Sequence, residues 1–222
     1  NNMLSIHSSL FSNVSVNAAV QRDKGSAEAQ SVQVRARIQA AAEARFKRYG
    51  FTKTTLAEIG ADCGMSAANI YRYFDCKGDI AAASAKQWLA NLRQDMAAIV
   101  ADSDFGAGER LHRMIRLKVK SLHGLIESDL HFEDLIEYVC RERGALIEAH
   151  RASERALVAQ LIVDGMGRGE FRPLNVDTIA AAVIVATQTF SQHGQVRGAP
   201  LQELLAETDN VVALMVEGML AR

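Results

Sequence analysis

Apolar residues recur along this chain at intervals of three and four positions, the spacing of helices that bury one face. The pattern predicts helices at residues 31–49, 55–64, 66–74, 77–101, 109–126, 129–139, 142–167, 176–193 and 201–221. Only Pro173 and Pro200 can break a helix, and aromatic residues make up just 6% of the chain. The sequence therefore predicts an all-α protein.

The segment 51–80 predicts two short helices joined by a turn at Gly64. Thr55 and Glu58 have the spacing of a capping box, so the first helix begins at or next to Thr55. Gly64 accepts the left-handed conformation that ends it, and Ser66 can cap a second helix that runs through Phe74. Two short helices set at a tight turn have the shape of a helix-turn-helix reader of the DNA major groove.

This segment resembles the DNA-binding domain of the TetR family of bacterial transcriptional regulators. The matching residues are Tyr49-Gly50-Phe51, Thr54-Thr55, Ile59, Gly64-Met65-Ser66, Ile70-Tyr71-Arg72-Tyr73-Phe74 and Lys77. The chain departs from the usual pattern at three places. Gly60 and Cys63 replace alanine, and Ala68-Asn69 replaces a Gly-Thr pair.

The resemblance implies an N-terminal, homeodomain-like three-helix DNA-binding domain, followed by a helical ligand-binding and dimerisation domain. We expect a flexible arm at residues 1–30, which has the option of touching DNA, a DNA-binding domain at 31–78 and the second domain at 79–222. Residues 31–80 hold eight Lys/Arg and five Asp/Glu, whereas residues 81–222 hold fifteen and nineteen. The segment with the net positive charge is therefore the one that would contact DNA phosphates.

The predicted DNA-binding surface combines phosphate contacts and base contacts. The tyrosine hydroxyls and the lysine suit phosphate, and the resemblance implies the same contacts; the alternative is that the tyrosines are core aromatics with wet tips. The asparagine suits adenine and the arginine suits guanine, although the arginine has phosphate or solvent as alternatives. The threonines can cap a helix, touch phosphate or do both. The residues concerned are Thr54, Thr55, Ser66, Ala67, Ala68, Asn69, Tyr71, Arg72, Tyr73 and Lys77.

The last two predicted helices are too apolar for surface helices of a monomer. The resemblance implies that they pair with their copies in a second subunit as a four-helix bundle. The expected interface residues are Val176, Ile179, Val183, Ile184, Phe190, Leu204, Val212, Met215 and Met219.

Bulky apolar residues with isolated polar ones also predict a ligand pocket between the fourth and eighth helices, and core packing is the alternative. The expected lining is Met114, Leu117, Phe132, Ile136, Tyr138, Thr187 and His193. The negative charge of this half argues against an anionic ligand, unless a cation such as Arg116 faces inward.

Other chemistry finds little support in the sequence. Cys63, Cys76 and Cys140 lack the spacing of a zinc or disulfide framework, so we expect free thiols, with redox sensing as the alternative. Glu109-x-x-His112 is one half of a di-iron motif whose second half is missing, and neither a metal nor another cofactor is expected. No catalytic motif and no apolar run of membrane-spanning length occurs.

The sequence thus predicts a cytoplasmic, homodimeric DNA-binding regulator and not an enzyme. We expect a repressor that a small-molecule effector releases from a palindromic operator by population shift. An activator, a helical interaction protein with a vestigial helix-turn-helix and a helical enzyme are the alternatives. The effector and the operator sequence cannot be derived from these residues.

Overall fold

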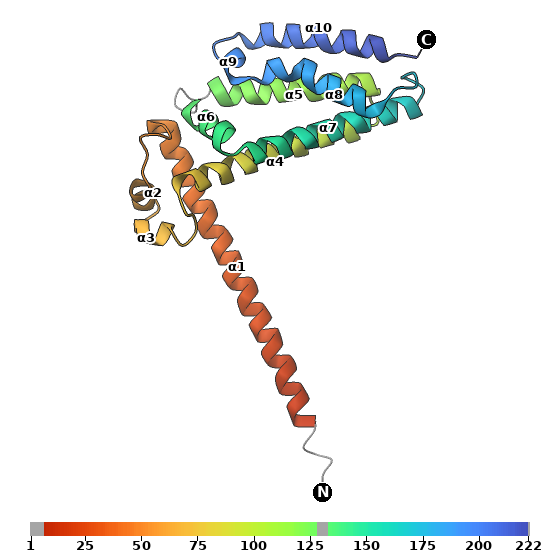
Figure 1. The fold of residues 1–222 in the computed structure, drawn as a ribbon. Coiled ribbons are helices and arrows are strands. Elements are labelled where there is room, and N and C mark those ends of the chain that lie inside the picture. The colour runs from red at the N-terminus through yellow and green to blue at the C-terminus, as the bar shows by residue number, and fades with distance from the viewer. Residues whose placement is uncertain (1–6, 128–132, 222) are drawn as a thin grey trace. The chain divides into compact units, whose positions relative to one another are not determined.

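The computed structural model describes residues 7–127 and 133–221, and this part of the chain is built from helices. An isolated bridge between Phe171 and Leu220 is the only β-type pairing among the described residues. The predicted all-α fold is confirmed. None of the helices in these residues combines the length and the apolar character needed to cross a membrane. The helices are α1 (His7–Tyr49), α2 (Leu56–Asp62), α3 (Ala67–Ile70), α4 (Lys77–Ala101), α5 (Ala107–Glu127), α6 (Glu133–Glu142), α7 (Gly144–Gly167), α8 (Val176–Thr187), η1 (Gln188–Ser191), α9 (His193–Val196) and α10 (Leu201–Met219) (Figure 1).

The largest differences from the predicted helix boundaries lie at the start of α1 and the end of α8. Helix α1 begins at His7, not near Ser31, so residues 7–30, expected as a flexible arm, are helical. No proline precedes Ser31 to stop a helix that extends toward the N-terminus. Helix α8 ends at Thr187, whose hydroxyl donates to the carbonyl oxygen of Val183 at 2.8 Å. A 3₁₀ turn and the short α9 follow it.

The chain divides into two compact units. The first comprises Asn1–Ala42 with Thr55–Ile80, and the second comprises Glu43–Thr54 with Ala81–Arg222. The boundary predicted after residue 78 lies in the first turn of α4, close to the division at Ile80. In the first unit Ile38, Ile59 and Ile70 are buried, as is Phe74. The guanidinium of Arg35 lies 4.8 Å from the centre of the Phe74 ring, a distance that suits a cation–π contact.

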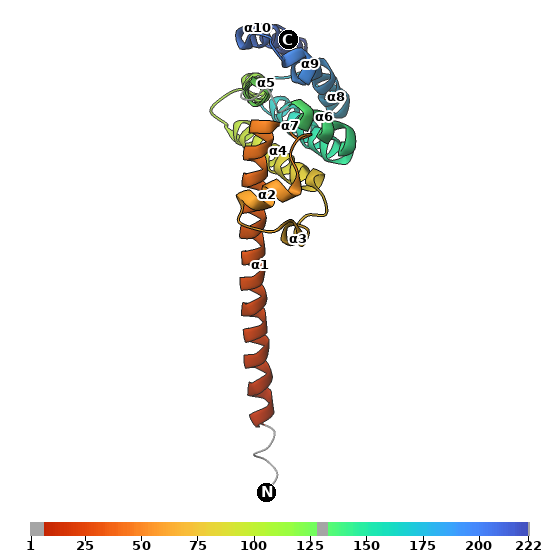
Figure 2. The ribbon, with the colours of Figure 1, turned by 90° about the vertical axis from the view of Figure 1, so that its left-hand side faces the viewer.

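The second unit is a helical bundle in which α5 contacts α7, α9 and α10, and α8 contacts α7 and α10. Figure 2 views α5 nearly along its axis, with these helices beside it. Met114 and Ile115 of α5 join Leu161 and Ile162 of α7 in one buried cluster. The end of α5 joins α9, η1 and α10 in a second cluster. Burial of this apolar surface is the main stabilising term for the bundle.

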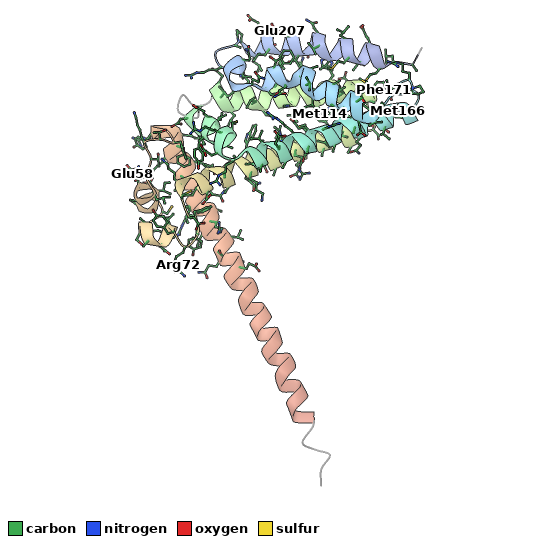
Figure 3. All side chains as sticks on the ribbon, viewed as in Figure 1. Glu58, Arg72, Met114, Met166, Phe171 and Glu207 are labelled. Carbon is green, nitrogen blue, oxygen red and sulfur yellow. The ribbon has the colours of Figure 1, made fainter. Side chains whose placement is uncertain are left out.

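The turn after α7 packs closely against one glycine of that helix. A β-carbon built on Gly165 would lie 2.3 Å from the Phe171 ring, so the ring rests directly on the helix backbone. Gly169, with φ of 73°, lets the chain reverse in the left-handed region. Figure 3 shows Phe171 beside Met166 at this end of the unit. Phe171 is 4% exposed, so it has little room to move away.

We therefore expect Gly165→Ala to destabilise the protein by about 1–3 kcal/mol, because the added methyl overpacks against Phe171. Gly167→Ala is the matched control. It lies two residues further along the same helix, where nothing approaches an added β-carbon within 4 Å. Alanine there should be neutral or stabilising by up to about 1 kcal/mol. Urea unfolding followed by circular dichroism measures both changes, and equal stability of the two variants would contradict the close packing.

Candidate DNA-binding surface and ligand cavity

Helix α2 begins with the capping box that the sequence predicts. The Thr55 hydroxyl accepts from the amide of Glu58 at 3.3 Å, and Glu58 Oε2 accepts from the amide of Thr55 at 2.8 Å. Two of the amides that a helix start leaves unpaired are thereby satisfied. The local sequence therefore fixes the start of the helix-turn-helix.

The turn between α2 and α3 depends on two glycines. Gly64 has φ of 65°, in the left-handed region that favours glycine. The amide of Met65 donates to the carbonyl oxygen of Gly60 at 2.8 Å. A β-carbon on Gly60 would lie only 2.7 Å from the Met65 carbonyl oxygen. Gly60, which stands where the family usually has alanine, thus lies where the turn approaches α2 unusually closely.

Helix α3 is shorter than predicted but keeps the predicted faces. Ser66 caps it by accepting from the amide of Asn69 at 3.2 Å. The helix ends at Ile70 instead of running through Phe74, because the next amides include bonds of the tighter three-residue type, such as Tyr73 to Ile70 at 2.9 Å. This tighter turn still buries both Ile70 and Phe74.

The opposite face of α3 and the turn after it carries polar and small side chains. Tyr71 is 56% exposed, which disfavours a core role for its ring. Figure 3 shows the side chain of Arg72 extending away from the ribbon of this segment. Exposed residues among those predicted to touch DNA are Thr55, Ser66, Ala68, Tyr71 and Arg72, and half-buried ones are Ala67, Asn69, Tyr73 and Lys77. All nine belong to the first unit, so the structure brings them together on one compact part of the chain.

Thr54 does not fit this surface. Its side chain is 2% exposed, and its hydroxyl donates to the carbonyl oxygen of Gly50 at 2.8 Å. The hydroxyl therefore holds the turn after α1 and cannot reach a phosphate in this conformation. The Thr55 hydroxyl is exposed but also donates to Glu58 Oε2 at 2.8 Å, so its first role is to cap α2.

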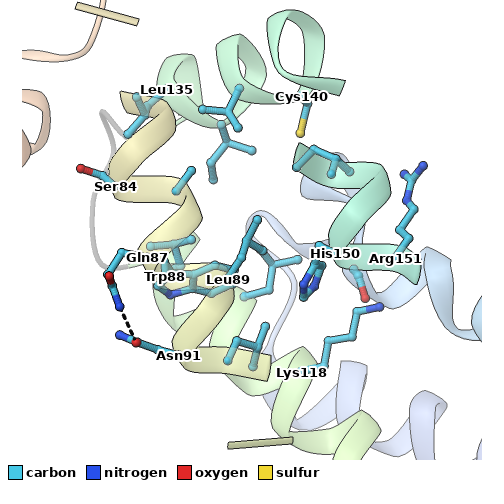
Figure 4. Close-up of a pocket in the computed structure, with 18 of the residues that line it drawn as sticks. Ser84, Gln87, Trp88, Leu89, Asn91, Lys118, Leu135, Cys140, His150 and Arg151 are labelled. Carbon is cyan, nitrogen blue, oxygen red and sulfur yellow. Dashed lines mark hydrogen bonds between the residues drawn. The ribbon is translucent and has the colours of Figure 1, made fainter. Parts of the chain in front are cut away.

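The second unit contains a cavity of about 450 Å³ between α4, α5, α6, α7 and the α8–η1 segment. Figure 4 shows Trp88 and Leu89 entering it from α4, with Leu135 and Cys140 on the α6 side. Its volume lies within the range of about 300–1,000 Å³ that small-molecule sites have. The remaining apolar lining consists of Ala85, Leu92, Leu122, Leu125, Ile136, Val139, Ile147 and Ile184.

Three charged or polar side chains meet in the wall of this cavity. Lys118 Nζ donates to Glu154 Oε2 at 3.0 Å and lies 2.9 Å from Oε1, while His150 Nε2 lies 3.3 Å from Oε1. Glu154 is 3% exposed. Burial raises the pKa of its carboxyl, but the close contact with His150 and the charge of Lys118 outweigh this and hold the pKa below its usual range. Figure 4 shows Lys118 and His150 converging on the same side of the cavity.

Helix α6 joins the cavity to the segment that precedes the helix-turn-helix. On one side it supplies the lining residues Leu135 and Ile136. On the other, Asp134 accepts from the amides of Phe51 and Thr52 at 3.2 and 2.8 Å. The ring of Tyr138 packs on that of Phe51 with 4.5 Å between ring centres. One short helix therefore contacts both the cavity and the residues leading into α2.

The structure places only some of the residues predicted to line the pocket at the cavity. Ile136 lines the cavity. Met114 and Leu117 pack in the core, Tyr138 packs on Phe51, and the buried Thr187 hydroxyl bonds its own helix, so these four belong to the surrounding packing. Phe132 and the side chain of His193 lie outside the described residues. Arg116, considered as an inward cation, pairs with Asp209 of α10 instead.

Lys118 and Glu154 were not predicted to line the cavity, although the sequence contains a signal for them. Lys118 follows Met114 by four positions and Ile115 by three, so it lies on the apolar stripe of its helix. Glu154 follows His150 by four positions and precedes Val158 by four. Charges on a buried stripe are rare without partners, and two such stripes on neighbouring helices predict a pair.

The predicted dimer residues lie on the inward faces of their helices. Core clusters of the same chain bury or partly bury them: Val176, Ile179, Val183, Ile184, Phe190, Leu204, Val212, Met215 and Met219. Val183, Phe190, Leu204, Val212 and Met219 are buried and have little area left for a second subunit, because helix periodicity selected the stripe that faces the chain's own core. The other four residues are half-buried. The large apolar side chains that α8 and α10 expose are Val185, 70% exposed, and Leu214, 72% exposed.

The cysteines and possible metal ligands offer no second site among the described residues. Cys63, Cys76 and Cys140 are free thiols, as predicted. Burial raises the pKa of Cys140, and the charge of Arg151 offsets this only in part, which leaves the thiol less reactive than an ordinary one. No group of three potential metal ligands occurs in the part of the chain that the structure describes.

Two family models match the chain. Residues 38–83 match the model described as bacterial regulatory proteins of the tetR family, and residues 107–212 match the tetracyclin repressor-like C-terminal domain. No curated protein sequence is significantly similar to the chain. The two matches cover both the helix-turn-helix and most of the helices around the cavity.

Solved structures share the fold at low sequence identity. A transcriptional regulator from Cytophaga hutchinsonii is 21% identical with a TM-score of 0.64, over 83% of this chain and 97% of its own. SmeT, the repressor of a Stenotrophomonas maltophilia multidrug efflux pump, is 20% identical with a TM-score of 0.61, over 84% and 90%. The Thermus thermophilus repressor FadR, solved with lauroyl-CoA, is 21% identical with a TM-score of 0.58, over 85% and 96%.

The family matches fall on the elements that carry the site. The first covers the capped α2, the glycine turn and the exposed face of α3, and the second covers α5 to α8 with most of the cavity wall. The chain belongs to the TetR family of bacterial DNA-binding transcriptional regulators.

Proposed function

We propose that this protein is a homodimeric repressor, released from a palindromic operator when a small molecule enters the cavity of its second unit. The observation that carries the proposal is the double contact of α6, which lines the cavity and holds the amides of Phe51 and Thr52. These residues lead directly into Thr55, the cap of α2. A ligand that displaces α6 would therefore act on the chain at the entrance to the helix-turn-helix.

The titles of similar structures support an effector of this kind. SmeT is a repressor that was also solved in complex with triclosan, and FadR is a repressor solved with lauroyl-CoA. The two ligands differ, so these titles support a ligand-responsive repressor without identifying the effector. An operator in bacterial DNA would place the protein's action in the cytoplasm.

The DNA contact would use the exposed face around α3. Ser66, Ala68 and Asn69 would face base edges, and Arg72 would meet a base or a phosphate. Tyr71 and Tyr73 would bond phosphate oxygens, and Lys77, at the first position of α4, would add a charge beside helix amides that already favour anions. The alanine methyls can contact only thymine methyls, so DNA shape would supply part of the specificity.

The dimer would form through the outward faces of α8 and α10. These faces carry small and apolar exposed residues at helical spacing: Thr178, Ala182, Val185 and Ala186 on α8, and Ala206, Asn210, Ala213 and Leu214 on α10. Small residues allow helices from two subunits to approach closely. Two copies of α8 and α10 would then make the four-helix contact.

Lys77→Ala should weaken binding to every DNA sequence and reduce the slope of log affinity against log salt by about 1, because one phosphate contact is lost. Asn69→Ala should instead relax the preference at one base position by about 1–3 kcal/mol. Fluorescence anisotropy with palindromic duplexes from the DNA that flanks the gene measures both. Lys120→Ala, an exposed lysine of α5, controls for the loss of charge. An unchanged affinity and salt slope for Lys77→Ala would refute the phosphate contact.

The double change Val185→Glu with Leu214→Glu should convert the dimer to a folded monomer. Both side chains are exposed in one chain, so the carboxylates remain in water unless a second copy covers them. Size-exclusion chromatography with light scattering gives the mass, and circular dichroism checks the fold. Val163→Glu, at a 54% exposed position of α7, is the control and should leave the mass unchanged. A stable dimer of the double variant would place the interface elsewhere.

A further inference from the structure

The buried charges of the polar cluster in the cavity wall cost folding free energy that apolar residues at the same positions would not. Lys118 and Glu154 come from α5 and α7, whose contact also includes the Arg110–Asp164 ion pair but is mainly apolar. A buried ion pair seldom stabilises a protein more than apolar residues of the same size would, because both charges lose their water. The position of this pair at a cavity, and not in the solid core, indicates that its role concerns what enters the cavity.

The charges that line the cavity favour a negatively charged guest. The basic lining residues are Lys47, Lys118 and Arg151, and the acidic ones are Glu43 and Glu154. Glu154 already faces both Lys118 and His150, which offset its negative charge, although its Oε1 accepts no hydrogen bond. An ammonium has three N–H donors, and Lys118 gives one to Glu154 Oε2 at 3.0 Å. Arg151 already donates to Glu148, so the donors and positive charge for an additional anionic group come from Lys118 and Lys47.

The rest of the cavity suits a hydrocarbon body. Trp88, Leu89 and Leu92 line it from α4, and Leu135 and Ile136 line it from α6. Figure 4 shows Trp88 and Leu89 across the open space from His150 and Arg151. The polar cluster lies on α5 and α7, which also add Leu122, Leu125 and Ile147 to the lining, while the bulky side chains of α4 and α6 form a second, largely apolar part of the wall. A guest that satisfies both parts must itself have an apolar body and one polar end.

We propose that the cavity binds an amphiphilic organic acid, with its carboxylate at Lys118 and His150 and its apolar body against Trp88 and α6. The proposal rests on the ligand-responsive function above and specifies the chemical class of its effector. A cationic amphiphile would meet Lys118 with like charge and would find Glu154 already paired. A neutral one would bury the same apolar body but would leave the additional positive charge unmatched.

The test compares ligands that share a chain and differ in the head group. Decanoate, decanol and decylamine are titrated into the full-length protein without DNA by isothermal calorimetry, each below its micelle concentration. We expect decanoate to bind at least tenfold more tightly than decanol, and decylamine to bind more weakly than either. Decanoate should also raise the melting temperature, because a ligand that binds only the folded state stabilises it.

Variants then locate the head group. Lys118→Met combined with Glu154→Gln removes both charges, so neither partner is left as a lone buried ion. In this variant the affinity for decanoate should fall at least tenfold, to the level of decanol, while the affinity for decanol should not change. Lys120→Met is the matched control: it removes a lysine from an exposed position of the same helix and should keep the preference for decanoate.

Each other outcome overturns the proposal. Equal affinities for decanoate and decanol in the original protein would show that no anionic group is recognised, and binding of none of the three would exclude this class of ligand. A preference for decanoate that survives the double variant would remove Lys118 from the site. Operator binding is measured separately, so loss of this proposal leaves the DNA-binding function standing, and a protein that binds decanoate but no DNA would refute only that function.

Discussion

Helix α5 imposes the main constraint on the second unit, because it must satisfy several neighbours at once. Met114 and Ile115 face the core that α5 shares with α7, Val119 and Ile126 face the cluster with α9 and α10, and Lys118 lies between them. Lys118 thus occupies a stripe where an apolar residue would pack well. Its charge is tolerated only because Glu154 approaches from α7. The packing of the unit and the polarity of the cavity consequently depend on the same helix.

The surface of α5 also ties the last helix to the unit. Asp209 of α10 accepts from Arg116 and lies 2.7 Å from His112 Nε2. Burial raises the pKa of Asp209, but the hydrogen bonds from Arg116 and His112 hold it below its usual range. The pair is partly exposed and adds little to stability, so the buried stripe of Leu204, Leu205 and Val212 decides which face of α10 turns inward. That choice leaves Leu214 outward, on the face proposed for dimerisation.

Sequence patterns predicted the cap and the turn of the helix-turn-helix well, because their signals are local, but they missed the length of α1. The capping box at Thr55 and the left-handed Gly64 each need only a few neighbouring residues, and the structure has both. Gly60 was different: its need for glycine comes from the Met65 carbonyl oxygen across the turn, a contact that spacing alone does not reveal. Thr54 was assigned to DNA for a similar reason, since only the fold shows its hydroxyl bonded to Gly50.

The cavity and the interface were harder to predict because they depend on which side of a helix faces which neighbour. Periodicity identifies an apolar stripe but does not say whether the same chain or a second copy covers it. Val183 was therefore predicted as an interface residue, although its side chain is 1% exposed within one chain. For the cavity, bulky residues such as Met114 gave no signal that separates lining from core. Lys118 did carry such a signal, because a charge on a buried stripe requires a partner or a ligand.

The geometry of α6 suggests how binding energy could become regulation. A ligand shifts a conformational equilibrium only by the difference between its affinities for the two states, and each tenfold difference corresponds to about 1.4 kcal/mol. Contact with Lys118 and His150 would supply affinity, but these residues lie on α5 and α7, away from the segment that leads to DNA. Leu135 and Ile136 are on the same helix as Asp134, which holds Phe51 and Thr52. The polar cluster of Lys118 and His150 would therefore determine which molecule binds. The apolar body of the ligand, which contacts α6, would determine how strongly binding changes the conformation at α2.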